Sequence, residues 1–109
     1  MKFDVFTSSL FNKEFKKICK KHHSAKNDVI TFVENLKRSP IQGTSIGNDC
    51  YKIRIAISSK GKGKSAGVRL ITKIRVTNKT IYLLSIYDKS ERDSISDKQL
   101  EAVLKSIEE

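Results

Sequence analysis

Apolar and polar residues alternate with period two along three stretches of the chain, residues 2–7, 51–58 and 68–76. Side chains on a strand point alternately to opposite faces, so this pattern predicts three strands that each bury one face. A fourth stretch, residues 81–87, is apolar on both faces. That composition is typical of a strand in the middle of a sheet. Strict alternation along it places Tyr87 and Lys89 on the same side as Ile81 and Leu83.

Three further stretches carry apolar residues at the spacing of an amphipathic helix. They cover residues 9–22, residues 25–37 and a last segment that begins after residue 96. Ser8 or Ser9 can cap the first helix and Ser24 the second, and the sequence SDKQ at 96–99 fits a capping box for the third. Because so few residues join the first two helices, we expect them to form an antiparallel hairpin over one face of the sheet.

The segment at 39–49 is rich in turn-forming residues, namely Pro40, Gly43, Gly47 and Asn48, and it predicts a loop. The elements therefore follow the order strand, helix, helix, strand, strand, strand, helix. A chain of 109 residues has the size of one domain. We expect a single α+β domain over residues 1–109, in which an N-terminal strand and a helical hairpin pack on a small, mostly antiparallel sheet, with a C-terminal helix.

Charge is distributed unevenly along the chain, which carries 22 Lys and Arg residues against 12 Asp and Glu residues, a net charge of +10. Between Tyr51 and Lys79 there is no acidic residue, and the basic ones stand at positions 52, 54, 60, 62, 64, 69, 73, 75 and 79. Lysine and arginine are common on the exposed face of an antiparallel sheet, which accounts for the alternation. The absence of any acid favours a partner that carries phosphate.

The strand at 68–76 orients part of this charge. Its apolar face carries Val68, Leu70, Thr72, Ile74 and Val76, and its other face carries Arg69, Ile71, Lys73 and Arg75. Three cations therefore point the same way on a rigid support. The preceding segment GKGKS at 61–65 lacks the spacing of a phosphate-binding P-loop, and a strand follows it where a P-loop needs a helix. We expect a cationic flap between two strands of a hairpin.

Other candidate chemistry is sparse. Cys19 and Cys50 are far apart and lack zinc-ligand spacing, and the adjacent His22 and His23 cannot share one helix face, so we expect a solvated helix end there. No metal or other cofactor is expected. The N-terminus has no signal peptide and no stretch approaches the length of an apolar membrane span, so we expect a cytoplasmic protein with no membrane partner.

The chain also resembles a known superfamily. The segments FNKEFKK (11–17), KKHHS (20–24), YKIRIA (51–56), GKGKSAGVR (61–69) and IYLLSIYDKSE (81–91) together are similar to the RelE/ParE superfamily of bacterial toxins, closest to its RelE-like and HigB-like branch. The resemblance implies the toxin of a type II toxin–antitoxin system. It implies an endoribonuclease that cuts mRNA on the ribosome without a metal, and a cognate antitoxin that inhibits it.

In that superfamily the site is a cluster of Lys and Arg on the concave sheet face, often with a Tyr near the last strand. By position, the resemblance implies catalytic roles for Lys60, Lys62, Lys64, Arg69, Lys73 and Tyr87. It implies RNA binding by Lys52, Arg54, Arg75 and Lys89. The planar fork of Arg69 suits two phosphate oxygens of the transition state, assisted by Lys73. One of Lys60, Lys62 or Lys64 is expected to act as acid or base, and the sequence leaves open which one.

Two other functions remain open at this point. The same superfamily contains toxins that inhibit DNA gyrase and do not cleave RNA, and a basic sheet also suits a plain RNA-binding module. The cluster at residues 60–64 with Arg69 and Tyr87 favours the nuclease, since a gyrase inhibitor needs no cationic sheet that faces mRNA.

Overall fold

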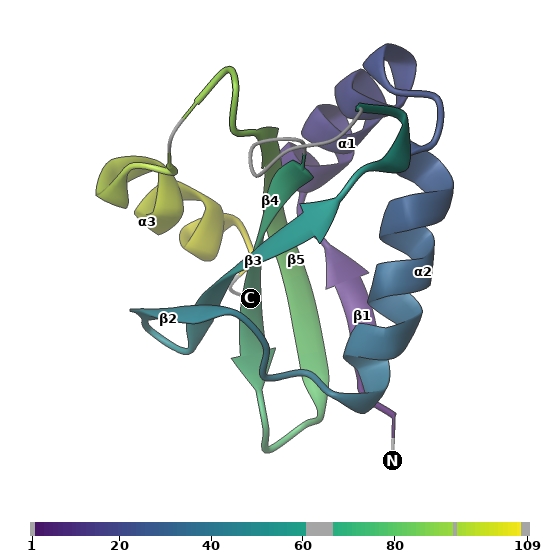
Figure 1. The fold of residues 1–109 in the computed structure, drawn as a ribbon. Helices are drawn as coiled ribbons and strands as arrows, with labels where there is room; N and C mark the ends of the chain where they lie inside the picture. The colour runs from purple at the N-terminus through teal and green to yellow at the C-terminus, as the bar shows by residue number, and fades with distance from the viewer. Residues whose placement is uncertain (1, 61–66, 93, 108–109) are drawn as a thin grey trace.

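A computed structural model describes residues 2–60, 67–92 and 94–107. Figure 1 shows a twisted sheet with helices on both faces. In chain order the elements are β1 (Asp4–Thr7), α1 (Ser9–Lys21), α2 (Ala25–Arg38), β2 (Thr44–Gly47), β3 (Cys50–Ala56), the short 3-10 turn η1 (Ser58–Lys60), β4 (Gly67–Arg75), β5 (Thr80–Asp88) and α3 (Asp97–Ser106). Within the described residues, no helix is long and apolar enough to cross a membrane.

The sheet has five strands in the order β1-β5-β4-β3-β2. β1 runs parallel to β5, and the other neighbouring pairs are antiparallel. The helices α1 and α2 cover one face, which we call the hairpin face, and α3 lies on the opposite side, which we call the α3 face (Figure 1). This arrangement confirms the expected α+β fold, with its N-terminal strand, helical hairpin, mostly antiparallel sheet and C-terminal helix.

The loop prediction for residues 39–49 was wrong in part, because residues 44–47 form the edge strand β2. The glycine that directly precedes β2 explains how a segment rich in turn-forming residues can form a strand. Gly43 has φ of 85°, and a β-carbon there would lie 2.3 Å from the carbonyl oxygen of Lys52 on β3. Only glycine allows the backbone to approach β3 so closely, and the close approach brings β2 into the sheet.

Local sequence signals set the helix ends. Ser8 caps α1 by accepting a hydrogen bond from the amide of Phe11, at 3.0 Å. The capping box predicted for the last helix is confirmed, with Ser96 and Gln99 bonding each other's backbone amides. The predicted cap of α2 differs, since Ser24 makes no capping bond and its hydroxyl instead donates to Asp28 at 2.8 Å.

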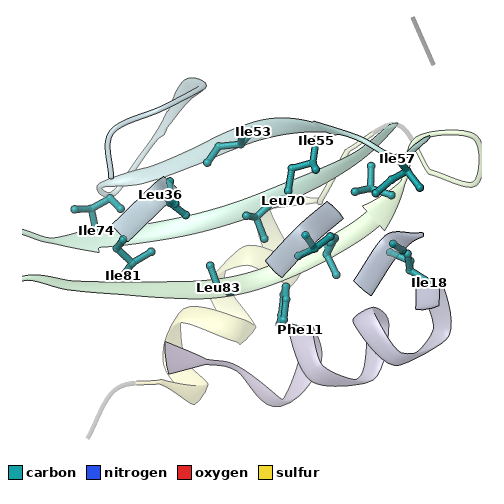
Figure 2. Packing of buried hydrophobic residues seen from close by; sticks show 14 residues of the cluster. Phe11, Ile18, Leu36, Ile53, Ile55, Ile57, Leu70, Ile74, Ile81 and Leu83 are labelled. Atoms are coloured by element: carbon teal, nitrogen blue, oxygen red, sulfur yellow. The ribbon is translucent and has the colours of Figure 1, made fainter. Parts of the chain in front are cut away.

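The main core lies between the sheet and the two N-terminal helices. Figure 2 shows side chains of β3, β4 and β5 meeting those of α1 and α2. This main core includes Phe11, Ile18, Val29, Leu36, Ile53, Ile55, Leu70, Ile74, Ile81, Leu83 and Ile86. Apolar burial on this scale is the largest favourable contribution to folding. A smaller core on the α3 face joins Cys50, Ile71, Leu84, Tyr87, Leu100 and Val103.

A β-bulge in β5 changes which way Tyr87 points. Ile71 of β4 pairs with Ser85 and the next residue, Thr72, pairs with Leu83, so Leu84 has no partner and β5 carries one extra residue. Beyond the bulge the alternation is shifted by one. The prediction that Tyr87 shares a side with Ile81 and Leu83 is therefore wrong, because Tyr87 lies on the α3 face, directly opposite Arg69.

Candidate functional site

Three predicted site residues form a row across the α3 face, where the strands place Arg54 of β3, Arg69 of β4 and Tyr87 of β5 side by side. Arg54 is exposed, whereas Arg69 and Tyr87 are each only 5% exposed. Residues paired across antiparallel strands point to the same side, with β-carbons about 5 Å apart. The row therefore joins two guanidinium groups and a phenol on neighbouring strands.

Arg69 is a buried cation for which the described residues supply no acidic partner. Its Nη1 donates a long hydrogen bond of 3.4 Å to the carbonyl oxygen of Val68. In the described part of the chain, no carboxylate forms an ion pair with Arg69. Burial and, secondly, the charge of Arg54 lower the pKa of Arg69 below its usual value. A guanidinium stays charged in proteins, so this environment is unfavourable for it, and a bound anion would relieve that cost.

Tyr87 is held as a neutral phenol. Burial raises its pKa, and the nearby charges of Arg92 and Arg69 lower it by less. Its hydroxyl is buried and makes no hydrogen bond of normal geometry within the described residues, although the backbone of Ile95 lies near it. At neutral pH this group can donate a proton or a hydrogen bond, and it cannot act as a base.

The other predicted residues spread away from this row. Lys52 lies opposite Ile71, one step further along the sheet on the same face. Lys73 is four residues from Arg69, about 13 Å along the strand, and its Nζ donates to the carbonyl oxygen of Asn48 at 2.9 Å. Arg75 stacks on the ring of Tyr82, 5.4 Å from its centroid. Lys73 and Arg75 therefore make their contacts at the other end of β4, away from Arg69.

Three of the predicted lysines precede or fall within the segment 61–66, and a fourth follows the last strand. Lys62 and Lys64 fall outside the described residues, and only the backbone of Lys60 is described, as the last residue of η1. Lys89 follows the end of β5 and is partly exposed. The row of Arg54, Arg69 and Tyr87 is thus the part of the predicted site that the described residues bring together.

Hydrogen bonds fix the chain at the point where residues 61–66 begin. Asp28 of α2 accepts from the amide of Ser58 at 2.9 Å and from the hydroxyl of Ser24. The Ser24 hydroxyl also accepts from the amide of Ser59 at 2.9 Å. The bonds that Asp28 itself accepts, first that from the Ser58 amide, lower the pKa of its carboxyl. The start of the predicted cationic segment is therefore tied to the N-terminus of α2.

Sequence reasoning missed a second polar cluster, which lies where α1 meets the end of β5. The carboxylate of Glu14 accepts from the hydroxyl of Ser85 at 2.6 Å and from Nη2 of Arg92 at 2.9 Å. The guanidinium carbon of Arg92 lies 4.5 Å from the ring centroid of Tyr87. One sequence signal was available, because Glu14 stands between Phe11 and Ile18 on the apolar stripe of the helix.

The histidine prediction needs a correction. His23 is exposed as expected, but the side chain of His22 is only 15% exposed, and its Nε2 lies 3.2 Å from the buried carboxylate of Asp88. Nearby, Lys21 and Glu91 form an ion pair at the surface. A cavity of about 230 Å³ lies beside these groups, lined also by Glu14 and Arg92. The described residues contain no cluster of His, Cys, Asp or Glu that could hold a metal ion.

Comparison with known proteins gives a consistent family. Residues 8–108 match the model of a family described as the RelE toxin of the RelE/RelB toxin–antitoxin system. A search of curated protein sequences finds no significant match.

Solved structures show the same fold at low sequence identity. A double-arginine mutant of the E. coli toxin RelE in the free state is 18% identical, with a TM-score of 0.65, and the match covers 99% of this chain and 100% of that one. The isolated E. coli RelE toxin is also 18% identical, with a TM-score of 0.60 and coverage of 94% and 97%. In the intact E. coli RelBE toxin–antitoxin complex, a chain of 18% identity matches with a TM-score of 0.60, over 79% of this chain and 95% of that one.

Proposed function

This chain belongs to the RelE toxin family, and from that membership we propose that it is a type II toxin that cleaves mRNA on the ribosome without a metal. The observation that carries the proposal is the position of Arg69. It is a buried guanidinium beside a second guanidinium, with no carboxylate paired to it among the described residues. A structural arginine is normally paired when buried, whereas an arginine that binds a phosphate must have free donors.

The chemistry requires little covalent participation by the protein. The 2′-hydroxyl of one nucleotide attacks the adjacent phosphorus and loses its proton to a base. The bond from phosphorus to the 5′-oxygen of the next nucleotide breaks, and an acid protonates that oxygen. A cyclic phosphate and a 5′-hydroxyl result. Positioning and electrostatic stabilisation account for most of such a rate enhancement.

The residues of the row suit distinct parts of this reaction. We assign Arg69 to the non-bridging phosphate oxygens, where negative charge accumulates in the transition state. Tyr87 is a neutral phenol and suits the acid or a hydrogen-bond donor. Arg54 is exposed and suits the approach of the RNA backbone, together with Lys52, Arg75 and Lys89. The base is sought among Lys60, Lys62 and Lys64, and Lys73 contributes charge from a distance.

Access to the row requires a movement of the C-terminal segment. Arg69 and Tyr87 are each 5% exposed, and Tyr87 shares a core with Ile95, Leu100 and Val103. RNA can contact Tyr87 only after that segment separates from it. The core on the α3 face is smaller than that on the hairpin face, so opening it disrupts fewer apolar contacts.

An antitoxin is the second partner that we propose. The structural match to a chain of the RelBE complex supports it. The net charge of +10 and the lack of acidic residues between Tyr51 and Lys79 favour an acidic or amphipathic antitoxin segment that covers the cationic face.

The experiment is expression of this chain alone in a bacterium, followed by assays of the purified protein. We expect growth arrest that the neighbouring gene product reverses. We also expect mRNA cleavage in a reconstituted translation reaction and little cleavage of free RNA. Inhibition of DNA gyrase without mRNA cleavage would establish the alternative toxin class. Unimpaired growth with soluble, well-expressed protein would contradict the proposal that this chain is a toxin.

A further inference from the structure

The carboxylate of Glu14 reaches the sheet at an unusual place. β1 pairs with β5 only from Thr80 to Leu83, so beyond Leu83 the edge of β5 is left open. Ser8, which follows β1, bonds this open edge through its side chain. Its hydroxyl donates to the carbonyl oxygen of Leu84 at 2.7 Å. Glu14 then accepts from the amide of Ile86 at 3.2 Å. A side chain of α1 thus satisfies a backbone group that a strand would otherwise pair.

The bonds of Glu14 are concentrated on the bulge. Its Oε1 accepts from the hydroxyl of Ser85 and the amide of Ile86, the two residues that follow the unpaired Leu84. A bulge in a strand is held by whatever bonds its displaced residues. Losing this acceptor would leave buried donors unsatisfied at the point where the register shifts.

The register matters because of what it places beside Arg69. With the bulge, Tyr87 lies opposite Arg69 and the acidic Asp88 lies opposite Val68. Without it, strict alternation from Leu83 would turn Tyr87 to the hairpin face and Asp88 to the α3 face. An acidic side chain would then stand near Arg69 and compete with phosphate. The bulge therefore keeps the arginine available for an anion.

Glu14 also binds the arginine that lies over the ring of Tyr87. Its Oε2 accepts from Nη2 of Arg92, and the same Nη2 lies 3.4 Å from the hydroxyl of Ser85. This pair is partly screened from water, with side-chain exposures of 30% for Arg92 and 18% for Glu14. The guanidinium of Arg92 is thereby held over the ring of Tyr87, at 4.5 Å from its centroid.

We propose that Glu14 is a positioning residue for the Arg69–Tyr87 pair, because it holds both the bulge that orients Tyr87 and the arginine that stacks on its ring. The positional part of this inference stands on contacts alone, and its catalytic consequence rests on the proposed function. Glu14 itself lies on α1, behind the strands that carry the row, and needs no contact with RNA.

The test uses the full chain labelled with 3-fluorotyrosine and observed by fluorine NMR. The three tyrosines are Tyr51, Tyr82 and Tyr87, and Tyr87→Phe assigns the third resonance. We expect Glu14→Ala to move the resonance of Tyr87 and leave that of Tyr51, which lies on the hairpin face. Glu14→Gln keeps a carbonyl acceptor for Ser85 and Ile86, so it should restore most of the wild-type position.

Two further variants guard against a purely structural effect. Glu34→Ala removes an exposed acid that pairs with Lys37 on α2, and it should move no tyrosine resonance. Ser85→Ala removes one hydroxyl from the bulge and should shift Tyr87 less than Glu14→Ala does. If Glu14→Ala does not fold, Ser85→Ala still reports on Tyr87, and an unmoved Tyr87 resonance in that variant would overturn the proposal.

The cleavage assay then separates this proposal from the proposed function. If the wild type cleaves mRNA, Glu14→Ala should lower kcat by about tenfold to a hundredfold with little change in KM, since misplacement by about 1 Å has such an effect. An unchanged rate together with an unmoved Tyr87 resonance would overturn the positioning role. A resonance that moves in a protein whose wild type cleaves no mRNA would support the positioning role and reject the nuclease.

Discussion

The two faces of one sheet carry different kinds of side chain. On the hairpin face, β3, β4 and β5 contribute an apolar core that includes Ile53, Leu70 and Ile81 and meets two helices. On the α3 face, the same strands carry a smaller core interrupted by Arg69 and by the hydroxyl of Tyr87, both buried and poorly satisfied. Stability is therefore concentrated on one face, and the energetically unfavourable groups of the candidate site lie on the other.

Leu70 and Arg69 are neighbours that test this contrast most strongly. Leu70 is fully buried in the main core, so Leu70→Ala should lower the free energy of unfolding by about 2 to 5 kcal/mol. Chemical denaturation measures it. Val76→Ala is the matched control, because Val76 is 65% exposed at the end of the same segment and should change stability by less than about 0.5 kcal/mol. A small effect at Leu70 would show that the hairpin face does not dominate stability.

Arg69→Leu should have the opposite sign. It replaces a buried cation that no carboxylate among the described residues compensates, so the free energy of unfolding should rise by about 0.5 to 2 kcal/mol in the absence of RNA. Because part of the strain is repulsion from Arg54, Arg54→Gln should also stabilise the protein, and less strongly. Thermal unfolding at low salt detects both changes. Destabilisation by Arg69→Leu would mean that this guanidinium has a structural partner.

The anchor at Asp28 should give a smaller, pH-dependent effect. Its carboxyl has a lowered pKa in the folded protein, so it stabilises the fold above its unfolded pKa of about 3.9. That contribution is lost as the pH falls through the lower, folded pKa. Asp28→Asn should lower the free energy of unfolding by about 0.5 to 1 kcal/mol at neutral pH. The difference from the wild type should shrink in acid, and a difference independent of pH would contradict the assignment.

Tyr87→Phe should give the smallest change. The Tyr87 hydroxyl has no normal hydrogen bond in the described residues, so its removal should leave stability nearly unchanged at neutral pH. Burial raises the pKa of the folded phenol, so the unfolded chain ionises first above about pH 10. The wild type should then lose stability as the pH rises toward the folded pKa, and Tyr87→Phe should lose less. Identical alkaline unfolding curves would rule out this burial effect.

Most of the fold was predictable because local signals agreed with the packing. Helical spacing, the serine at position 8 and the capping box at residues 96–99 set the helices to within a residue or two. Alternation likewise identified the two faces of β4, including the side occupied by Arg69. The strand β2 was missed because glycine and proline at 39–49 read as a loop, while the close approach at Gly43 depends on β3.

The arrangement of the candidate site was predictable only in part. The charge pattern identified Arg54 and Arg69. Their neighbour Tyr87 depends on the bulge at Leu84, and no residue type in that part of the strand indicates a bulge. Strict alternation consequently placed Tyr87 on the wrong face. The cluster of Glu14, Ser85 and Arg92 joins residues more than 70 positions apart, so only the folded chain brings it together.

The most direct measurement of the central claim is the rate at which Arg69→Ala cleaves mRNA in a reconstituted translation reaction, with Arg75→Ala as the control. Arg75 lies on the same face at the far end of β4, stacked on Tyr82. We predict that Arg69→Ala lowers the rate by about a hundredfold or more, as the loss of one preorganised donor does. We expect it to stay folded and still bind its antitoxin, while Arg75→Ala loses far less activity. A rate for Arg69→Ala within a few-fold of the wild type would contradict the account.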